Sequence, residues 1–210
     1  MQYLLEHLAI YVSAMSGVLA ARGKRIDLFG VVVLGVVTAL GGGTIRDVIL
    51  DLRPVFWVGD PWFLLTAFAC AMLTFLIEGA LMRMHPLARD LMNLADAASL
   101  ALVTMVGTEK TLAGGFSPVI AVTMGVLTGT AGGIIRDMMV GEIPMVFRQE
   151  IYLYATASLA GAIVFILLAR AGANDLAQLA SIATVFILRL AAIRKKWRLP
   201  TLGREGSHDG

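Results

Sequence analysis

Cysteine, histidine and charged residues are all scarce in this sequence. Of its 210 residues, one is cysteine, three are histidine and 15% are charged. A single cysteine excludes an intrachain disulfide, and Cys70 is expected to pack as a small hydrophobic side chain. The histidines lack metal-ligand spacing, and there is no serine–histidine–aspartate or cysteine–histidine set. We therefore expect no enzyme, no cofactor and no resident metal, and a net charge of +2 gives no indication of a nucleic-acid partner.

Apolar residues dominate what remains. They make up 58% of the chain, and the mean hydropathy is +0.82. Several apolar runs approach the roughly 20 residues that a helix needs to cross a bilayer. The first run lacks a basic start and is followed by Arg22, Lys24 and Arg25, so no cleavable signal peptide is expected. The composition predicts a single all-α transmembrane domain over residues 1–210.

A glycine-rich stretch occurs twice, over residues 35–47 and 125–137, at a constant offset of 90 in the numbering. The same offset joins Pro54 to Pro144 and Glu6 to Asp96. Self-similarity at a fixed period indicates duplication. We predict repeat one over about 4–82, repeat two over about 91–170, a seventh helix over about 176–193 and a tail over 194–210. The predicted spans are 4–20, 28–47, 61–82, 91–107, 118–144, 151–169 and 176–193.

Each repeat contains three predicted spans, so the second copy enters the membrane from the opposite face. This predicts an inverted repeat, an architecture common in proteins that move solutes. Lys and Arg gather in the loops after spans one, three and five and at the C-terminus. Cytoplasmic loops carry the excess of basic residues, so we predict a periplasmic N-terminus and a cytoplasmic C-terminus in a bacterial inner membrane.

The repeated glycines are predicted to serve both packing and a kink in each helix. The glycines are Gly41, Gly42 and Gly43 in the first copy and Gly132 and Gly133 in the second. Glycine lets membrane helices approach closely, and consecutive glycines weaken a helix. A break would free backbone carbonyls, which is tolerated at membrane depth only inside protein or beside water. We predict close packing of spans two and five, with the breaks also lining a solute path.

Two arginine–aspartate pairs place charge inside the predicted spans: Arg46–Asp47 and Arg136–Asp137. Ionisable groups in membrane helices are costly and face the bundle interior or water. Because adjacent helical residues point about 100° apart, each arginine is expected to pair across the bundle instead. Glu6 and Asp96 are the candidate partners. The charges are interpreted either as structural ion pairs or as charged vestibules at the two ends of a pore.

Hydroxyl side chains also recur within the predicted spans. Thr38 and Thr128 are repeat mates, and Thr44, Thr130, Ser13, Ser16, Ser99 and Thr104 accompany them. In membrane helices such hydroxyls usually bond back to their own backbone. Several on neighbouring helices could also form a polar path for a partly hydrated ion.

The duplicated Gly-Gly-X-X-Arg-Asp pattern, with Pro54 and Pro144 after it, resembles the prokaryotic branch of the trimeric intracellular cation (TRIC) channels. The resemblance implies seven transmembrane helices, an inverted three-plus-three repeat with one last helix, and a homotrimer. It also implies a pore in each protomer, helices two and five kinked at their glycines, and conduction of monovalent cations, chiefly potassium, with sodium as a further candidate ion. The second copy departs from the first, since Thr-Ala-Gly-Gly replaces Leu-Gly-Gly-Gly, and a milder kink is expected there.

Three function classes stay open at this point. A potassium-permeable channel is favoured. A secondary transporter of a small solute such as glycine is the alternative, since inverted repeats with broken helices are usual in transporters. A purely structural membrane protein is disfavoured by the charges within the spans.

Overall fold

The computed structural model describes residues 1–81, 87–147 and 153–195. Within these residues the chain forms eight α-helices and one 3₁₀ turn, without strands, so the all-α prediction is confirmed. The helices are α1 (Gln2–Ala20), α2 (Leu28–Ile49), α3 (Phe56–Gly59), α4 (Trp62–Leu81), α5 (Leu87–Ala113), α6 (Pro118–Met139), α7 (Tyr154–Arg170) and α8 (Asn174–Lys195), and the turn η1 covers Met145–Phe147. Most of the predicted tail, residues 196–210, lies outside the described residues.

Seven of these helices match the seven predicted ones, and the short α3 is the addition. Five helices are long and apolar enough to cross a membrane: α1, α2, α5 from Leu91, α6 and α8. Shorter apolar helices cover Trp62–Ile77 and Tyr154–Arg170. The fourth span was predicted to end at residue 107, but α5 continues to Ala113. Lys110, which was expected in a loop, is therefore part of a helix.

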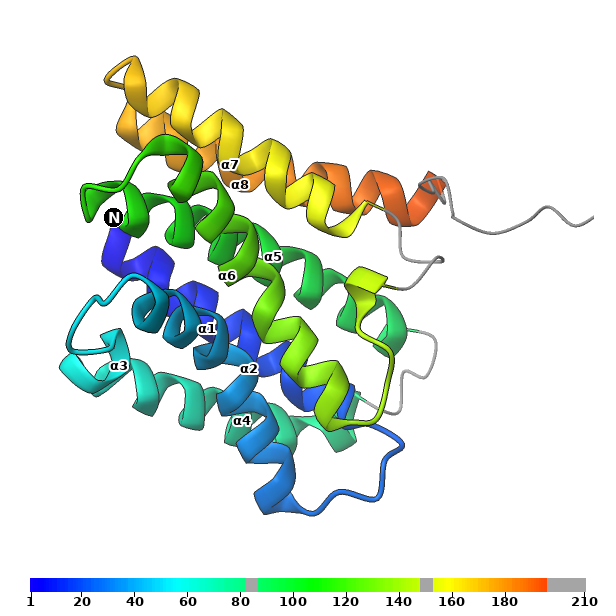
Figure 1. The fold of residues 1–210 in the computed structure, drawn as a ribbon. Helices are drawn as coiled ribbons and strands as arrows, with labels where there is room; N and C mark the ends of the chain where they lie inside the picture. The colour runs from blue at the N-terminus through cyan, green and yellow to red at the C-terminus, as the bar shows by residue number, and fades with distance from the viewer. Residues whose placement is uncertain (82–86, 148–152, 196–210) are drawn as a thin grey trace, which may run out of the picture.

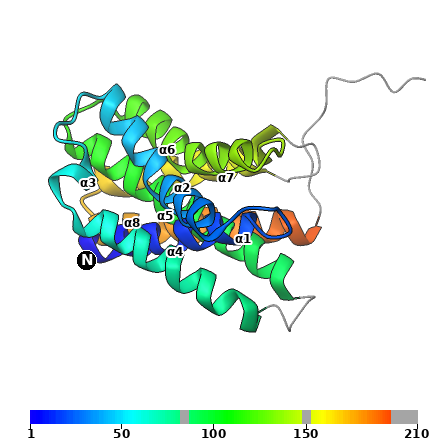
Figure 2. The same ribbon diagram turned by 90° about the horizontal axis from the view of Figure 1, so that it is seen from below.

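The long helices pack side by side in a bundle with roughly aligned axes (Figures 1 and 2). The N-terminus lies at one end of the bundle, and α8 finishes at the other end (Figure 1). Equivalent helices of the two predicted repeats run in opposite directions: α1 starts near the bundle end where α5 finishes, and α2 and α6 run against each other (Figure 1). Chain direction thus agrees with an inverted arrangement of the two copies.

The α2 and α6 helices begin and end in the same way. Asp27 and Ser117, which are 90 positions apart, cap the two N-termini by accepting hydrogen bonds from backbone N–H groups three residues on. After the last turn, Asp51 (φ 51°) and Gly141 (φ 72°) are left-handed. The next N–H groups, of Leu52 and Glu142, donate to the carbonyls of Asp47 and Asp137, five residues earlier, at 2.8 Å. This is the six-to-one hydrogen bond of the Schellman motif. Equivalent sequence has produced equivalent local structure.

The α2 and α6 backbones touch at a crossing built from glycine. A Cβ added to Gly132 would lie 2.5 Å from the carbonyl oxygen of Thr38, and one added to Gly42 would come closer still to the carbonyl oxygen of Thr128. These two contacts are each other's repeat mates. Only residues without a side chain allow this approach, so the predicted close packing of spans two and five is confirmed.

The described α2 and α6 are not interrupted at their glycines, whereas the kink expected there stays a prediction. Both α2 and α6 stay continuously helical through their glycine runs. The backbone carbonyls there remain within helices, because the neighbouring helix packs directly against the glycines and supports them. The glycines provide space for the backbone of the neighbouring helix and do not interrupt their own helix.

The rim of the bundle is apolar. Large hydrophobic side chains are exposed on the outer faces of the helices, among them Leu4, Phe29, Leu76, Leu167 and Ile187. An exposed apolar surface of this extent is unusual for a water-facing protein and fits contact with lipid. The chain is a multi-pass membrane protein.

The crossing generates a prediction about glycine substitutions. Gly42→Ala and Gly132→Ala place a methyl group against a backbone carbonyl, and overpacking of this kind costs about 1–3 kcal/mol. We expect both variants to unfold at lower temperature in detergent. Gly41→Ala is the matched control, because its methyl group meets only the flexible end of Ile135 at 2.9 Å. Equal melting temperatures for the Gly41→Ala and Gly42→Ala proteins would contradict the account.

Candidate functional site

Two pockets that contain charged side chains lie on either side of the α2–α6 crossing. The first pocket is at the N-terminal end of the bundle and is lined by Glu6, Ile10, Gly43, Arg46, Phe56 and Lys110 among others. The second pocket is lined by Ser13, Thr38, Asp96, Ser99, Arg136 and Tyr154 among others. Ala39, Val103 and Thr128 line both pockets. The two pockets therefore meet at the crossing.

Arg46 and Asp47 pair with each other at the first pocket. The Arg46 Nε and Nη2 atoms donate to Asp47 Oδ1 at 2.9 and 2.6 Å, and both side chains are buried. The expectation that Arg46 pairs with Glu6 is wrong, because the long guanidinium side chain folds back far enough to reach the next residue. Asp47 Oδ2 also accepts from the backbone N–H of Phe56 at 2.9 Å, which fixes the start of α3.

Glu6 takes a different partner from the one predicted. Its Oε2 lies 2.6 Å from Nζ of Lys110, which the extended α5 brings to this position. The Lys110 ammonium also lies 5.5 Å from the ring centres of Phe56 and Phe63. The Arg46 guanidinium lies 5.9 Å from the Phe56 ring centre. Aromatic faces attract cations at such distances, so Phe56 links the two positive charges of this pocket.

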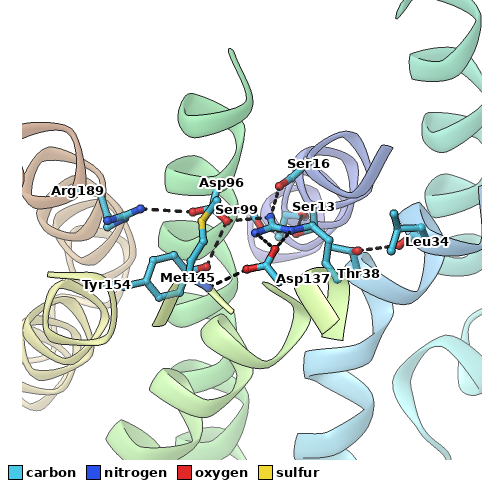
Figure 3. A network of polar contacts seen from close by, with 12 residues as sticks. Ser13, Ser16, Leu34, Thr38, Asp96, Ser99, Asp137, Met145, Tyr154 and Arg189 are labelled. Atoms are coloured by element: carbon cyan, nitrogen blue, oxygen red, sulfur yellow. Dashed lines mark hydrogen bonds and ion pairs between the residues drawn. The ribbon is translucent and has the colours of Figure 1, made fainter. Parts of the chain in front are cut away.

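Arg136 is the centre of the second site and is almost fully buried. Its Nε donates to Asp137 Oδ1 at 2.9 Å, and its Nη1 donates to Asp96 Oδ1 at 2.9 Å and to Ser16 Oγ at 2.6 Å. The predicted pair between Arg136 and Asp96 is therefore confirmed, although the adjacent Asp137 shares the arginine. Asp137 Oδ2 accepts from the Met145 backbone N–H at 2.8 Å (Figure 3). Asp47 Oδ2 accepts from the Phe56 backbone N–H in the same way.

Asp96 also connects to the last two helices. The Tyr154 hydroxyl on α7 donates to Asp96 Oδ1 at 3.2 Å, and Arg189 Nη2 on α8 lies 3.5 Å from Asp96 Oδ2 (Figure 3). The Arg189 guanidinium stacks over the Tyr154 ring, 4.7 Å from its centre. Asp96 thus receives groups from α6, α7 and α8, and holds three helices at one point.

The charges balance within each site. The first site contains Arg46, Asp47, Glu6 and Lys110, and the second contains Arg136, Asp137, Asp96 and Arg189. Each has two positive and two negative groups. Burying an unpaired charge is very costly, and pairing with hydrogen bonds is how proteins avoid that cost.

Two members of these sites were missed in the sequence. Lys110 was assigned to a loop, and Arg189 was counted within the seventh helix without a role. The signal for Arg189 was available, since it is a lone arginine inside the apolar run that follows Val185. An arginine in such a run requires a buried partner or water.

Gly43 and Gly133 make room for the aromatic residues of the two sites. A Cβ on Gly43 would lie 2.6 Å from the Phe56 ring, and one on Gly133 would lie 2.9 Å from the Tyr154 hydroxyl. The two glycines are repeat mates, so in each site a glycine at the equivalent position leaves space for an aromatic side chain. Gly41 faces only the end of a side chain, which explains why its mate in the second copy is Ala131.

Some of the hydroxyl side chains bond back to the backbone of their own helix, as predicted. Thr38 and Thr128 donate to the backbone carbonyls of Leu34 and Met124, one turn earlier, so the predicted back-bonding is confirmed. Ser13 also bonds back, to the Ala9 carbonyl at 2.6 Å, and its hydroxyl meets that of Ser99 at 2.6 Å across α1 and α5, within the second pocket. Hydroxyl oxygens therefore face the pocket from α1, α2, α5 and α6.

Comparison with known proteins places this arrangement in a family. A family model described as "Glycine transporter" matches residues 3–78 and 93–170, one segment in each half of the chain. The UPF0126 inner membrane protein YadS of Escherichia coli K12 is 45% identical over 201 residues, covering 95% of each chain. A UPF0126 membrane protein of Vibrio cholerae is 42% identical, covering 95% of this chain and 82% of the relative. The chain belongs to the family that this model describes, and the UPF0126 membrane proteins are its relatives.

Solved structures connect the family to TRIC channels. The TRIC trimeric intracellular cation channel orthologue from Rhodobacter sphaeroides is 39% identical, with a TM-score of 0.83 over 92% of this chain and 97% of that one. A prokaryotic TRIC channel crystallised in 0.5 M KCl is 30% identical, with a TM-score of 0.84 over 94% and 98%. The resemblance read from the duplicated motif is confirmed.

The second site yields a prediction about stability. Replacing Arg136 with methionine keeps much of the side-chain volume but leaves Asp137 without its buried cation. Breaking a buried pair on one side costs about 3–5 kcal/mol. We expect Arg136→Met to give little folded protein by size-exclusion chromatography, and an added Asp137→Asn to restore part of it.

Lys24→Met is the matched control. It removes a cation whose partner, Glu142, is at the surface, with side-chain exposures of 35% and 44% for the pair. Exposed pairs contribute about 1 kcal/mol or less. A folded Arg136→Met protein as stable as the Lys24→Met protein would show that the buried pair has no structural role.

Proposed function

We propose that this protein is a monovalent cation channel, permeable to potassium, with a pore inside each protomer. The observation that carries the proposal is the pair of pockets, each beside a charge-balanced site, that share Ala39, Val103 and Thr128 at the α2–α6 crossing. The proposed pathway enters one pocket, passes the crossing and leaves through the other. The TRIC names of the structural neighbours support this class of function.

The chemistry of the path suits a partly hydrated cation. The hydroxyls of Ser13, Ser99, Thr38 and Thr128 offer oxygen atoms around the second pocket and the crossing. Thr38 and Thr128 use their hydroxyl protons on the backbone, which leaves oxygen lone pairs for an ion. The arginines do not repel the ion from a distance, because each one is neutralised by an aspartate at hydrogen-bond distance. In this proposal Arg46 and Arg136 serve the scaffold and the crossing forms the constriction.

The surrounding architecture follows the same proposal. Seven helices span a bacterial inner membrane as an inverted three-plus-three repeat with α8 added, and three copies assemble, as the names of the structural neighbours suggest. The distribution of Lys and Arg in the sequence favours a periplasmic N-terminus and a cytoplasmic C-terminus. Arg83, Arg148, Lys196, Arg198 and Arg204 of that basic set lie outside the described residues.

A transporter of a small solute such as glycine is the second candidate. It rests on the description of the family model that matches both halves of the chain. The first pocket offers both a carboxylate, Glu6, and an arginine, Arg46, which are the groups a zwitterion needs. Against it, both residues are already engaged with other side chains.

Flux through purified protein in liposomes separates the two candidates. With a potassium gradient and sodium opposite, a channel gives electrical current in planar bilayers and fast potassium release, without a coupling ion. A carrier gives concentrative glycine uptake and no single-channel events. We expect channel currents. Glycine uptake without potassium current would overturn the proposal.

Val103 allows the path itself to be tested, because it lines both pockets where they meet. We expect Val103→Phe to reduce potassium flux at least several-fold by filling the junction, and Val103→Ala to leave it unchanged or raise it. Both proteins should elute as wild type does, since Val103 is only partly buried. Equal flux through the two variants would remove the junction from the path.

Orientation gives a separate prediction. A reporter that fluoresces only in the cytoplasm, fused to the C-terminus, is expected to be bright, and the same reporter fused to the N-terminus dark. The reverse pattern in well-expressed protein would contradict the topology.

A further inference from the structure

Glu109 and Gln178 form a part-buried polar pair that neither pocket uses. Glu109 is near the end of α5, and Gln178 is in the second turn of α8. The Gln178 Nε2 donates to Glu109 Oε1 at 2.7 Å, and Gln178 is only 5% exposed. The pair joins α8, the helix that follows the two repeats, to α5 at the bundle end where the N-terminus lies (Figure 1).

Each member of this pair has one oxygen atom left over. Glu109 Oε2 and Gln178 Oε1 are buried and have no hydrogen-bond partner among the described residues. An ionised carboxylate only accepts hydrogen bonds, and so does an amide oxygen. Neither leftover atom can therefore satisfy the other while Glu109 is ionised, and buried polar groups without partners are rare and costly.

A single proton on Glu109 gives both of these oxygen atoms a hydrogen-bond partner. A protonated Glu109 carries an O–H donor on Oε2, and the free acceptor on its existing partner is Gln178 Oε1. The two groups then form a ring closed by two hydrogen bonds, with the amide N–H donating to Oε1 and the acid O–H donating to the amide oxygen.

We propose that Glu109 is a proton-binding site that is occupied at neutral pH and fastens α8 to α5 through Gln178. The charged groups near Glu109 are Glu6 on α1 and Asp175 on α8, which are negative, and the adjacent Lys110 on α5, which is positive. Lys110 is already paired with Glu6, so Asp175 leaves the surroundings negative on balance. This inference does not depend on the proposed conduction.

Infrared spectroscopy of the purified protein tests the proton directly. At neutral pH in heavy water, the wild-type protein should show the carbonyl stretch of a buried protonated carboxylic acid, and Glu109→Gln should lack it. Glu142→Gln is the control, since Glu142 lies at the surface in an ion pair with Lys24 and should leave the band unchanged. A wild-type spectrum without a band that Glu109→Gln removes would overturn the proposal.

Stability provides a second, independent readout. Glutamine at position 109 copies the protonated acid, because its amide N–H can donate to Gln178 Oε1. We expect Glu109→Gln to match the wild-type melting temperature at neutral pH. The folded wild type holds a proton that the unfolded chain has released, so its stability should fall as the pH is raised, whereas Glu109→Gln should not share that fall. A Glu109→Gln protein that melts well below wild type at every pH would show that the ionised carboxylate is the native form.

Discussion

The close approach of two helix backbones at Gly42 and Gly132 is the constraint on which the rest of the molecule depends. Each glycine lies against the carbonyl of a threonine on the opposite helix, Thr128 or Thr38. Membrane helices gain no hydrophobic driving force from packing together, so close contact between small residues is a main source of their association. The crossing fixes the distance between α2 and α6. It thereby fixes the two pockets that flank it and the narrow junction between them.

Charge balance is the second requirement, and it is met by groups from outside the repeated motif. Each arginine–aspartate pair is neutral by itself, so the further acid of each site, Glu6 or Asp96, requires a second cation. Lys110 supplies it on one side and Arg189 on the other. The two ends then differ: the Lys110 side chain is 22% exposed, whereas that of Arg189 is 2% exposed. Near-symmetric sequence has produced one wetter site and one fully buried site.

Much of this fold could be predicted from the sequence, because duplication and hydrophobic runs are local and periodic signals. The repeat mates Gly42 and Gly132 were recognised as packing positions, and Asp96 as a partner of Arg136. The partners of Glu6 and Arg46 could not be predicted, because side-chain reach and the true end of α5 decide them. An interruption of the helices at the glycines is not seen, and sequence does not reveal that a neighbouring backbone packs against these residues. The pair of Glu109 and Gln178 carries no motif, and only the packing of α8 brings it together.

The central claim is that the two pockets are vestibules of one pathway, divided at the α2–α6 crossing. Accessibility of single cysteines tests it most directly, in a Cys70→Ser background that removes the native thiol. Ile10→Cys is in the first pocket and Ser99→Cys in the second. The account predicts that a small, membrane-impermeant cationic thiol reagent modifies Ile10→Cys only from the side of the N-terminus and Ser99→Cys only from the opposite side, each modification reducing potassium current. Modification of both positions from one side, or modification of both without any change in current, would contradict it.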